Sequence, residues 1–248
     1  MKLFSLSRFL KKLSNDDTMS NLSTSDLEKG MPKLKDKFFV EKSGLDFDYA
    51  SINTTKGINN HHSEFLIIEG YREAAKELLS NLIADKDIDW LKLDSKIYPI
   101  IFLIRHYLES ILKTTLRYYR IIYDEALSDE VGYEKGHSLK GQWDLLKPYI
   151  ERNYKFYDEN LKDELLETNC AVDNIINEID VIDKSSFSFR YSFEGTKSFT
   201  DKIKYSIKEP KFIDIQNLYD VFIKLTNYFE GVKDEAQNML DEKQSNIG

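Results

Sequence analysis

Four ionisable side chains interrupt an otherwise apolar stretch, LIRHYLESILK, at residues 103–113. They are Arg105, His106, Glu109 and Lys113. Arg105, Glu109 and Lys113 follow one another at intervals of four residues, so on a helix they lie along one side with opposite charges within reach. Burying an unpaired polar group costs roughly 2–7 kcal/mol, and an unpaired charge costs more. The four groups therefore either lock a structure together or line a site, and the residues leave both interpretations open.

Two further segments carry groups of related chemistry. His137, in KGHSLK, directly precedes a predicted helix, where an imidazole is suited to general acid–base work or to phosphate contact near a positive helix end. It is equally compatible with an ordinary loop residue. Arg190, in FSFRYSF, stands between aromatic residues, Tyr191 among them. A guanidinium in that position stacks on rings, or binds a phosphate or a carboxylate such as Asp180 or Asp183.

The opening segment is expected to be central in the fold, because residues 101–104 and 108–112 are apolar on nearly every side. A polar lock predicts that Arg105 and Glu109 are both mostly buried. It also predicts that they share a hydrogen-bonded network with a residue distant in sequence, and His137 and Arg190 are the leading candidates. A site instead requires an exposed His beside an Arg in a basic cleft.

Metal and cofactor chemistry is not expected. The single cysteine, Cys170, allows no disulfide within the chain and no Cys-based metal site. His61 and His62 form an adjacent pair, but no second cluster of ligands lies nearby in the sequence. The chain has no Gly-rich phosphate loop, no nucleophile elbow and no zinc-protease motif.

The net charge of −8 means that bulk electrostatics do not favour nucleic acid, so any RNA contact needs a local basic patch. One cysteine does not imply an oxidising compartment, and we expect the protein in the cytoplasm. No stretch of about 18 apolar residues occurs, so we expect no integral membrane association. The opening residues MKLFSLSRFLKKLSNDD lack the cleavage site of a secretory signal.

These side chains must be positioned by helices, because apolar residues recur at helical spacing through most of the chain after residue 62. The last predicted helix has apolar residues on more than one face, which favours a homodimer. In the second helix, Pro99 is expected in the first turn, where proline is tolerated. The predicted helices cover residues 63–85, 95–123, 138–154, 158–180 and 212–240.

The predicted fold class is mainly α, a helical bundle around one core. Alternating aromatic and polar residues in SFSFRYSFEGTKSF and KIKYSIKE predict a short β-hairpin near residues 187–207. Residues 1–62 are rich in Ser, Asp, Asn and Lys, and are expected to form an irregular, partly disordered arm or linker. The bundle is expected over residues 63–240, with a disordered tail at 241–248.

Four segments, in this order, resemble the HEPN superfamily, the helical domains of many prokaryotic toxins and antiphage defence proteins. They are YPIIFLIRHYLESILK (98–113), GHSLKGQWDLL (136–146), SFSFRYSFEG (186–195) and IDIQNLYDVF (213–222). The resemblance covers about residues 63–239. The usual superfamily motif, an Arg followed a few residues later by a His on the same helix, does not occur here, because His106 follows Arg105 at once.

The resemblance implies a helical bundle that often dimerises, and an operon-encoded partner protein is a further expectation. In active members, Arg and His cleave RNA without a metal, the His moving a proton and the Arg stabilising the phosphorane. Carried over to this chain, the catalytic candidates are Arg105, His106, His137 and Arg190, and the supporting residues are Glu109, Lys113 and Tyr191.

Three functions stay open at this point. The first is a metal-independent endoribonuclease of a toxin or defence system. The second is a non-catalytic sensor or adaptor that binds a nucleotide, RNA or a partner protein. The third is a structural protein that docks through its N-terminal arm. The sequence leaves open whether the protein is an enzyme at all.

Overall fold

The computed structural model describes residues 36, 60–125, 136–153, 159–194, 204–208 and 211–246. The predicted arm, residues 1–62, lies outside the described residues apart from Asp36 and the backbone of residues 60–62. Contacts within the chain divide it into residues 1–52 and residues 53–248, and every helix and strand given below belongs to the second unit.

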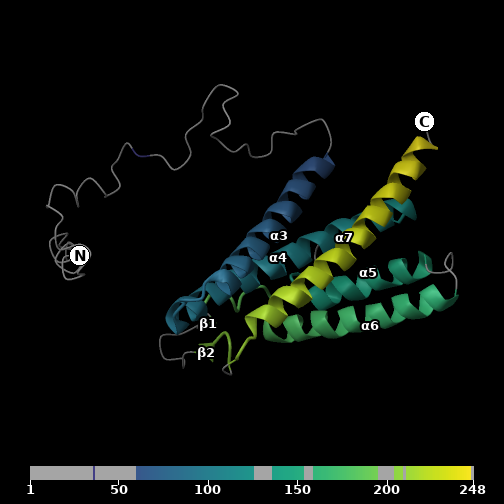
Figure 1. Cartoon of the computed structure of the whole chain (residues 1–248). Coiled ribbons are helices and arrows are strands. Elements are labelled where there is room, and N and C mark those ends of the chain that lie inside the picture. The colour runs from purple at the N-terminus through teal and green to yellow at the C-terminus, as the bar shows by residue number, and fades with distance from the viewer. Residues whose placement is uncertain are drawn as a thin grey trace, which may run out of the picture. The chain divides into compact units, whose positions relative to one another are not determined.

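The described part of the chain is mainly α, as predicted (Figure 1). Helix α4 begins at Trp90 and runs for 33 residues, the longest of the five. In chain order the elements are α3 (Asn60–Ala84), α4 (Trp90–Ile122), α5 (Leu139–Asn153), α6 (Glu159–Ile182), β1 (Phe193–Glu194), β2 (Lys204–Tyr205) and α7 (Ile215–Ser245).

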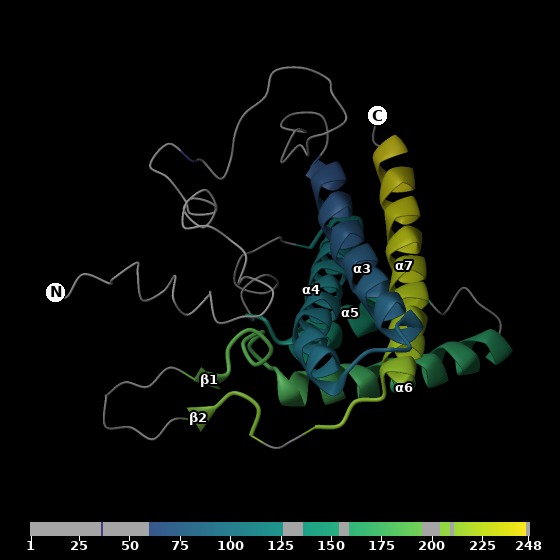
Figure 2. The same ribbon diagram turned by 60° about the vertical axis from the view of Figure 1, so that its left-hand side comes forward.

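Helix α4 is the centre of the bundle, because it packs against α3, α5 and α7. Helix α6 packs on α5, and Figure 2 shows it crossing the direction of α3 and α7. All five helices contribute to one hydrophobic core. Its fully buried members include Leu79, Tyr107, Trp143, Ile176 and Phe229, one from each helix. The predicted bundle around a single core is therefore confirmed for the described residues.

The predicted start of the second helix at Ser95 is wrong, because α4 begins five residues earlier. Asp89 caps the helix, since its carboxylate accepts a hydrogen bond of 2.7 Å from the backbone N–H of Lys92. Pro99 therefore lies inside the helix and not in its first turn. A proline there removes one backbone hydrogen bond, at a cost of about 3 kcal/mol. The cap and the burial of the following turns, from Ile100 onward, outweigh that cost.

The expected β structure is smaller than predicted. Residues 193–194 and 204–205 pair antiparallel, with Phe193 opposite Tyr205. The connection, residues 195–203, lies outside the described residues, so a complete hairpin stays a prediction. The predicted extended conformation for residues 187–190 is wrong, because these residues form a turn.

The predicted disordered tail is wrong for residues 241–245, which continue α7. Lys243 gives the physical reason. Its ammonium group donates hydrogen bonds of 2.9 Å to the carbonyl oxygens of Ile121 and Ile122. Those carbonyls belong to the last turn of α4, where the following helical N–H donors are missing, although that of Ile121 also accepts a bond of 3.3 Å from the N–H of Asp124. The end of α7 is therefore held on the end of α4.

Candidate functional site

The Arg105 guanidinium is at the centre of a buried polar network. The residue has no surface exposed to solvent (0%). Its Nε donates to the backbone carbonyl of Asp183 at 3.0 Å, and the Asp183 carboxylate lies 3.4 Å away. Nη1 donates to Glu109 at 3.0 Å, and Nη2 donates to the backbone carbonyl of His137. One side chain thus ties α4 to the residues that follow α6 and to those that precede α5.

The Glu109 carboxylate joins the remaining groups of this network. Its Oε1 accepts a hydrogen bond of 2.7 Å from Lys113 and lies 2.8 Å from Nδ1 of His137. Burial alone would raise the pKa of Glu109, but the hydrogen bonds from Lys113 and His137 outweigh it and lower the pKa. Glu109 is therefore ionised at neutral pH.

The ionised Glu109 fixes the orientation of the His137 ring. A carboxylate only accepts hydrogen bonds, so Nδ1 of His137 carries the proton that it shares with Glu109. In the neutral ring Nε2 then holds the lone pair. The His137 side chain is 56% exposed, while Glu109 is 5% exposed. The pair consists of a buried carboxylate and an imidazole that extends from it to the surface.

The segment GHS holds His137 in place by its local conformation. Gly136 has a φ of 68°, in the left-handed region that glycine adopts without strain. The Ser138 hydroxyl accepts a hydrogen bond of 3.0 Å from the N–H of Gly141, which caps the start of α5. The same hydroxyl donates to Asp180 of α6 at 3.2 Å. His137 therefore sits between a constrained glycine and a helix cap that α6 supports.

A tight turn after α6 is built around Asp183. Its carboxylate accepts hydrogen bonds of 2.6 and 2.8 Å from the N–H groups of Phe187 and Ser188. This is why the alternating sequence does not extend into a strand here. Because Arg105 binds the carbonyl of Asp183, the network on α4 also positions this turn.

Arg190 projects from this turn and is exposed. Its Nε donates to the carbonyl of Ser186 at 2.6 Å. Its guanidinium carbon lies 5.8 Å from the ring centre of Phe102 and 5.6 Å from that of Tyr191. Both distances fall within the range of cation–π contact.

His106 lies outside the hydrogen-bonded network and packs among aromatic rings. Its ring meets Tyr71 edge-on at 4.3 Å and stacks on Phe102 at 5.6 Å. Desolvation lowers the pKa of His106, and although Glu109 acts against this shift, the positive charge of Arg105 adds to it. The imidazole is therefore neutral at pH 7.

The sequence-predicted polar lock is confirmed. Arg105 and Glu109 are buried and paired, and His137 is the distant partner. Arg190, the other candidate partner, contacts aromatic rings instead. Asp183 was predicted as a carboxylate partner of Arg190, but it pairs with Arg105. The catalytic and supporting roles assigned to these residues stay predictions.

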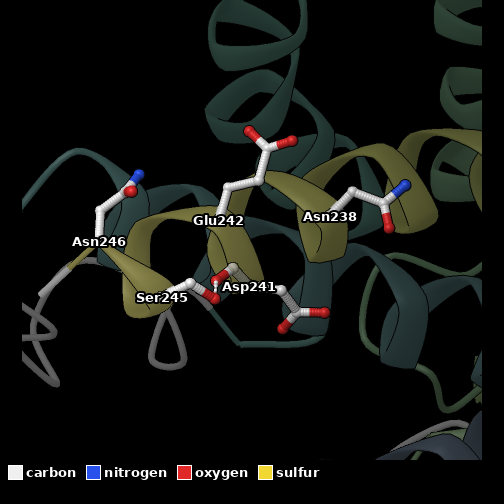
Figure 3. Close-up of a pocket in the computed structure, with 5 residues that line it drawn as sticks. All are labelled: Asn238, Asp241, Glu242, Ser245 and Asn246. Atoms are coloured by element: carbon white, nitrogen blue, oxygen red, sulfur yellow. Dashed lines mark hydrogen bonds between the residues drawn. The ribbon is translucent and has the colours of Figure 1, made fainter. Parts of the chain in front are cut away.

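A pocket on the described surface lies away from all of these residues. Figure 3 shows it on the last turns of α7, where the Ser245 hydroxyl donates to the carbonyl of Asp241 at 2.8 Å. None of the sequence-predicted site residues contributes to it. Its lining consists of Asn238, Asp241, Glu242, Ser245 and Asn246.

Within the described ranges, no group of three or more His, Cys, Asp and Glu side chains is arranged to hold a metal ion. The side chains of His61 and His62 are not among the described ones. No described helix combines the length and the apolar character needed to cross a membrane.

Comparison with family models, with curated proteins and with solved structures finds no match for this chain. The resemblance to the HEPN superfamily therefore stays a prediction from the four sequence segments. The site must be interpreted from its own geometry.

Proposed function

We propose that this protein is a helical module that binds RNA at the surface around Lys113, His137 and Arg190. The Arg105–Glu109 network is its scaffold. The observation that carries this proposal is the complete burial of Arg105 together with the engagement of all three of its side-chain nitrogens. An arginine that stabilises a transition state must direct its donors at the reacting phosphate. The donors of Arg105 are directed at the protein itself.

The polar side chains that remain for a ligand are those near the surface. Lys113 and His137 are adjacent, because both bind the same oxygen of Glu109. Arg190 adds an exposed guanidinium on the turn that Arg105 positions. Lys113 and Arg190 supply the local positive charge that an acidic protein needs in order to bind a phosphate backbone, and the imidazole of His137 adds a hydrogen-bonding group.

The resemblance to the HEPN superfamily supports RNA as the partner, and it also supports an operon-encoded partner protein. In this proposal the protein works in the cytoplasm as a homodimer. The single cysteine is compatible with that compartment.

Binding of a fluorescent RNA of about 16 nucleotides, followed by anisotropy, tests the proposal. Lys113→Gln should weaken binding several-fold and make it less dependent on salt between about 50 and 200 mM, because fewer counterions are released. His137→Gln should also weaken binding, because the imidazole contact is lost. Lys224→Gln, at an exposed position on α7, is the matched control and should leave binding unchanged. Wild-type protein that binds no RNA at low salt would refute the proposal.

A metal-independent endoribonuclease is a second candidate, favoured by the hydrogen bond between Glu109 and His137. A neutral Nε2 would take the proton of a ribose 2′-hydroxyl while its oxygen attacks phosphorus. The 5′-oxygen then leaves and takes up a proton, and the product strand ends in a 2′,3′-cyclic phosphate. Lys113, next to His137, would stabilise the negative charge on the phosphorus oxygens.

The two candidates differ in one product. Purified wild-type protein incubated with total RNA and EDTA, between about pH 6 and pH 8, should leave the RNA intact if it is a binding module. New 2′,3′-cyclic phosphate ends that disappear in His137→Ala would establish the nuclease in its place. The melting temperature of His137→Ala is measured alongside, so that loss of fold is not mistaken for loss of activity.

A further inference from the structure

Aromatic side chains gather around Arg190 in a way that the proposed phosphate contacts do not require. We name this surface the aromatic face, and its members are Tyr98, Phe102, Phe189, Arg190 and Tyr191. The rings of Tyr98 and Phe189 lie 6.5 Å apart, and Arg190 lies over both Phe102 and Tyr191. The first half of α4 and the turn after α6 thus build one surface.

The aromatic face is open to solvent. Tyr98 is 48% exposed and Tyr191 is 53% exposed, while Phe102 and Phe189 are half-buried and support them. Burial of large aromatic side chains is among the stronger stabilising contributions in a fold, so exposed rings beside a cation indicate a contact surface.

We propose that the aromatic face binds the unpaired bases of single-stranded RNA. The inference rests on the proposed RNA binding and adds the class of RNA. Every base has a flat π-face that stacks on Tyr or Phe, and proteins that bind single strands combine such rings with cations that follow the backbone. In a duplex the bases are stacked on each other and are not available to these rings.

The charges at the aromatic face fit a nucleic-acid strand. The Nε of Arg190 is held by the carbonyl of Ser186, which directs the guanidinium over the rings of Phe102 and Tyr191. Its exposed end can bind a phosphate with two parallel hydrogen bonds. His106 lies one turn after Phe102 on α4 and stacks on its ring, so that it extends the row of rings along the helix toward Lys113.

The rigidity of the face also favours this ligand. Arg105 holds the carbonyl of Asp183, and Asp183 holds the turn that carries Phe189, Arg190 and Tyr191. A stacking surface that is ordered before binding loses little conformational entropy when the bases arrive. The buried network thus acts as a positioning device for the aromatic face.

The test compares two fluorescent probes of one sequence by anisotropy with the full-length protein: single-stranded RNA and the RNA duplex. Single-stranded RNA should bind at least about tenfold more tightly than the duplex. Tyr98→Ala and Tyr191→Ala should each weaken single-strand binding by about fivefold to a hundredfold, because a stacked base contributes that much. Arg190→Lys keeps the charge but loses the planar group, and it should weaken single-strand binding more than duplex binding.

Leu166→Ala is the matched control. Leu166 is 43% exposed, close to the 48% of Tyr98, and it lies on α6. It is roughly 26 Å along that helix from Asp183, where the turn that carries Arg190 begins. This variant should bind RNA like the wild type, and circular dichroism should show that all variants keep their helices.

The outcomes separate this inference from the proposal on which it rests. A wild type that binds none of the probes refutes both. Binding that is weakened by Lys113→Gln but not by Tyr98→Ala or Tyr191→Ala refutes the aromatic face alone, as does equal affinity for single strand and duplex. A proline-rich peptide that binds more tightly than the RNA and displaces it would show that the rings bind a protein ligand. That result would also overturn the inference.

Discussion

His137 contributes to the molecule through two separable groups. Its backbone carbonyl accepts a hydrogen bond from Arg105 and belongs to the scaffold. Its ring takes no part in that bond. The ring forms a separate hydrogen bond with Glu109 and extends from there to the surface. A substitution at this position removes the ring and leaves the carbonyl in place. At Glu109 no such separation exists, because the same carboxylate serves Arg105, Lys113 and His137.

Glu109→Ala should therefore destabilise the protein strongly. Removing one partner of a buried ion pair leaves the others uncompensated, at a cost of about 3–5 kcal/mol. For a chain of this size, that corresponds to a fall in melting temperature of roughly 6–20 °C. Thermal denaturation followed by circular dichroism measures it.

The control for this prediction is Glu73→Ala. Glu73 also accepts a hydrogen bond from an arginine, Arg72, at 3.1 Å, but its side chain is 51% exposed. Exposed pairs of this kind contribute little, so its melting temperature should stay within about 2 °C of the wild type. A shift equally small in Glu109→Ala would contradict the structural role of the network.

His106 should make stability depend on pH between about pH 7 and pH 5. Burial against Tyr71 and Phe102 lowers its pKa below the ordinary value of 6.5, Glu109 opposes the shift, and the charges of Arg105, Lys113 and Arg190 support it. The unfolded chain then binds the proton more readily than the folded one. Stability is complete above pH 6.5 and decreases as the pH falls toward the lowered pKa.

The comparison that isolates this effect is His106→Phe, which keeps an aromatic ring between Tyr71 and Phe102 but does not titrate. Melting temperatures are measured for both proteins across the same pH series. The wild type should lose more stability than the variant between about pH 7 and pH 5. Parallel curves would show that His106 titrates alike in the folded and unfolded states.

At the scale of helices, periodicity predicted most of the fold, because long apolar stripes are local features. Boundaries were less predictable. Pro99 looked like a first-turn proline, whereas the cap at Asp89 sets the start of α4. The alternating residues after Phe187 looked like a strand. They form a turn because the N–H groups of Phe187 and Ser188 donate to the carboxylate of Asp183. That outcome depends on a contact between elements, which the local pattern does not contain.

The candidate site was predictable to a similar extent. The spacing of Arg105 and Glu109 predicted their pairing, and the apolar flanks predicted their burial. Asp183 as the second acidic partner of Arg105 could not be derived, because it lies 78 residues away and is placed by the packing of α6. The sequence indicates only that a further acceptor must exist, because a buried guanidinium needs more than one acceptor for its donors.

Lys243→Met should weaken the junction of α7 and α4. It removes two charged hydrogen bonds of 2.9 Å to the carbonyls of Ile121 and Ile122, together with the ion pair to Asp124. The carbonyl of Ile121 then keeps the N–H of Asp124 as a donor. Because the site is partly exposed, we expect the free energy of unfolding to fall by about 1–2 kcal/mol, measured by urea denaturation. Lys224→Met, at an exposed position of the same helix, should leave it unchanged. Equal values for the two variants would show that the end of α7 contributes nothing to α4.

At the scale of the whole molecule, α3 and not α7 presents the exposed apolar surface that favours a homodimer. The apolar residues of α7 that suggested a second face, such as Tyr219 and Tyr228, pack against the core. Large apolar side chains remain exposed by 48–51% at Phe65, Leu66 and Ile67, in the first turns of α3. Exposed apolar side chains at adjacent positions form a patch, and such patches mark surfaces that a protein partner covers.

We expect light scattering at micromolar concentration to give twice the 29.1 kDa mass of one chain. Leu66→Glu should shift the mass toward that of the monomer, because it places a charge in the apolar contact. Glu73→Ala, on the same helix, serves as the control. A wild type that has the monomer mass throughout the micromolar range would refute the dimer.

The last prediction separates scaffold from function in the working molecule. His137→Ala keeps the carbonyl that Arg105 binds, and Lys113 still neutralises Glu109, so the fold should survive with a melting temperature within about 4 °C of the wild type. If the protein is an RNA-binding module, cross-linking in cells that express the wild type should recover intact RNA, and His137→Ala should recover several-fold less. Glu109→Ala should lower the melting temperature strongly and also recover less RNA, because it breaks the scaffold. RNA that is fragmented in cells expressing the wild type but intact in cells expressing His137→Ala would overturn the binding module. It would establish the ring of His137 as the acid–base group of a nuclease.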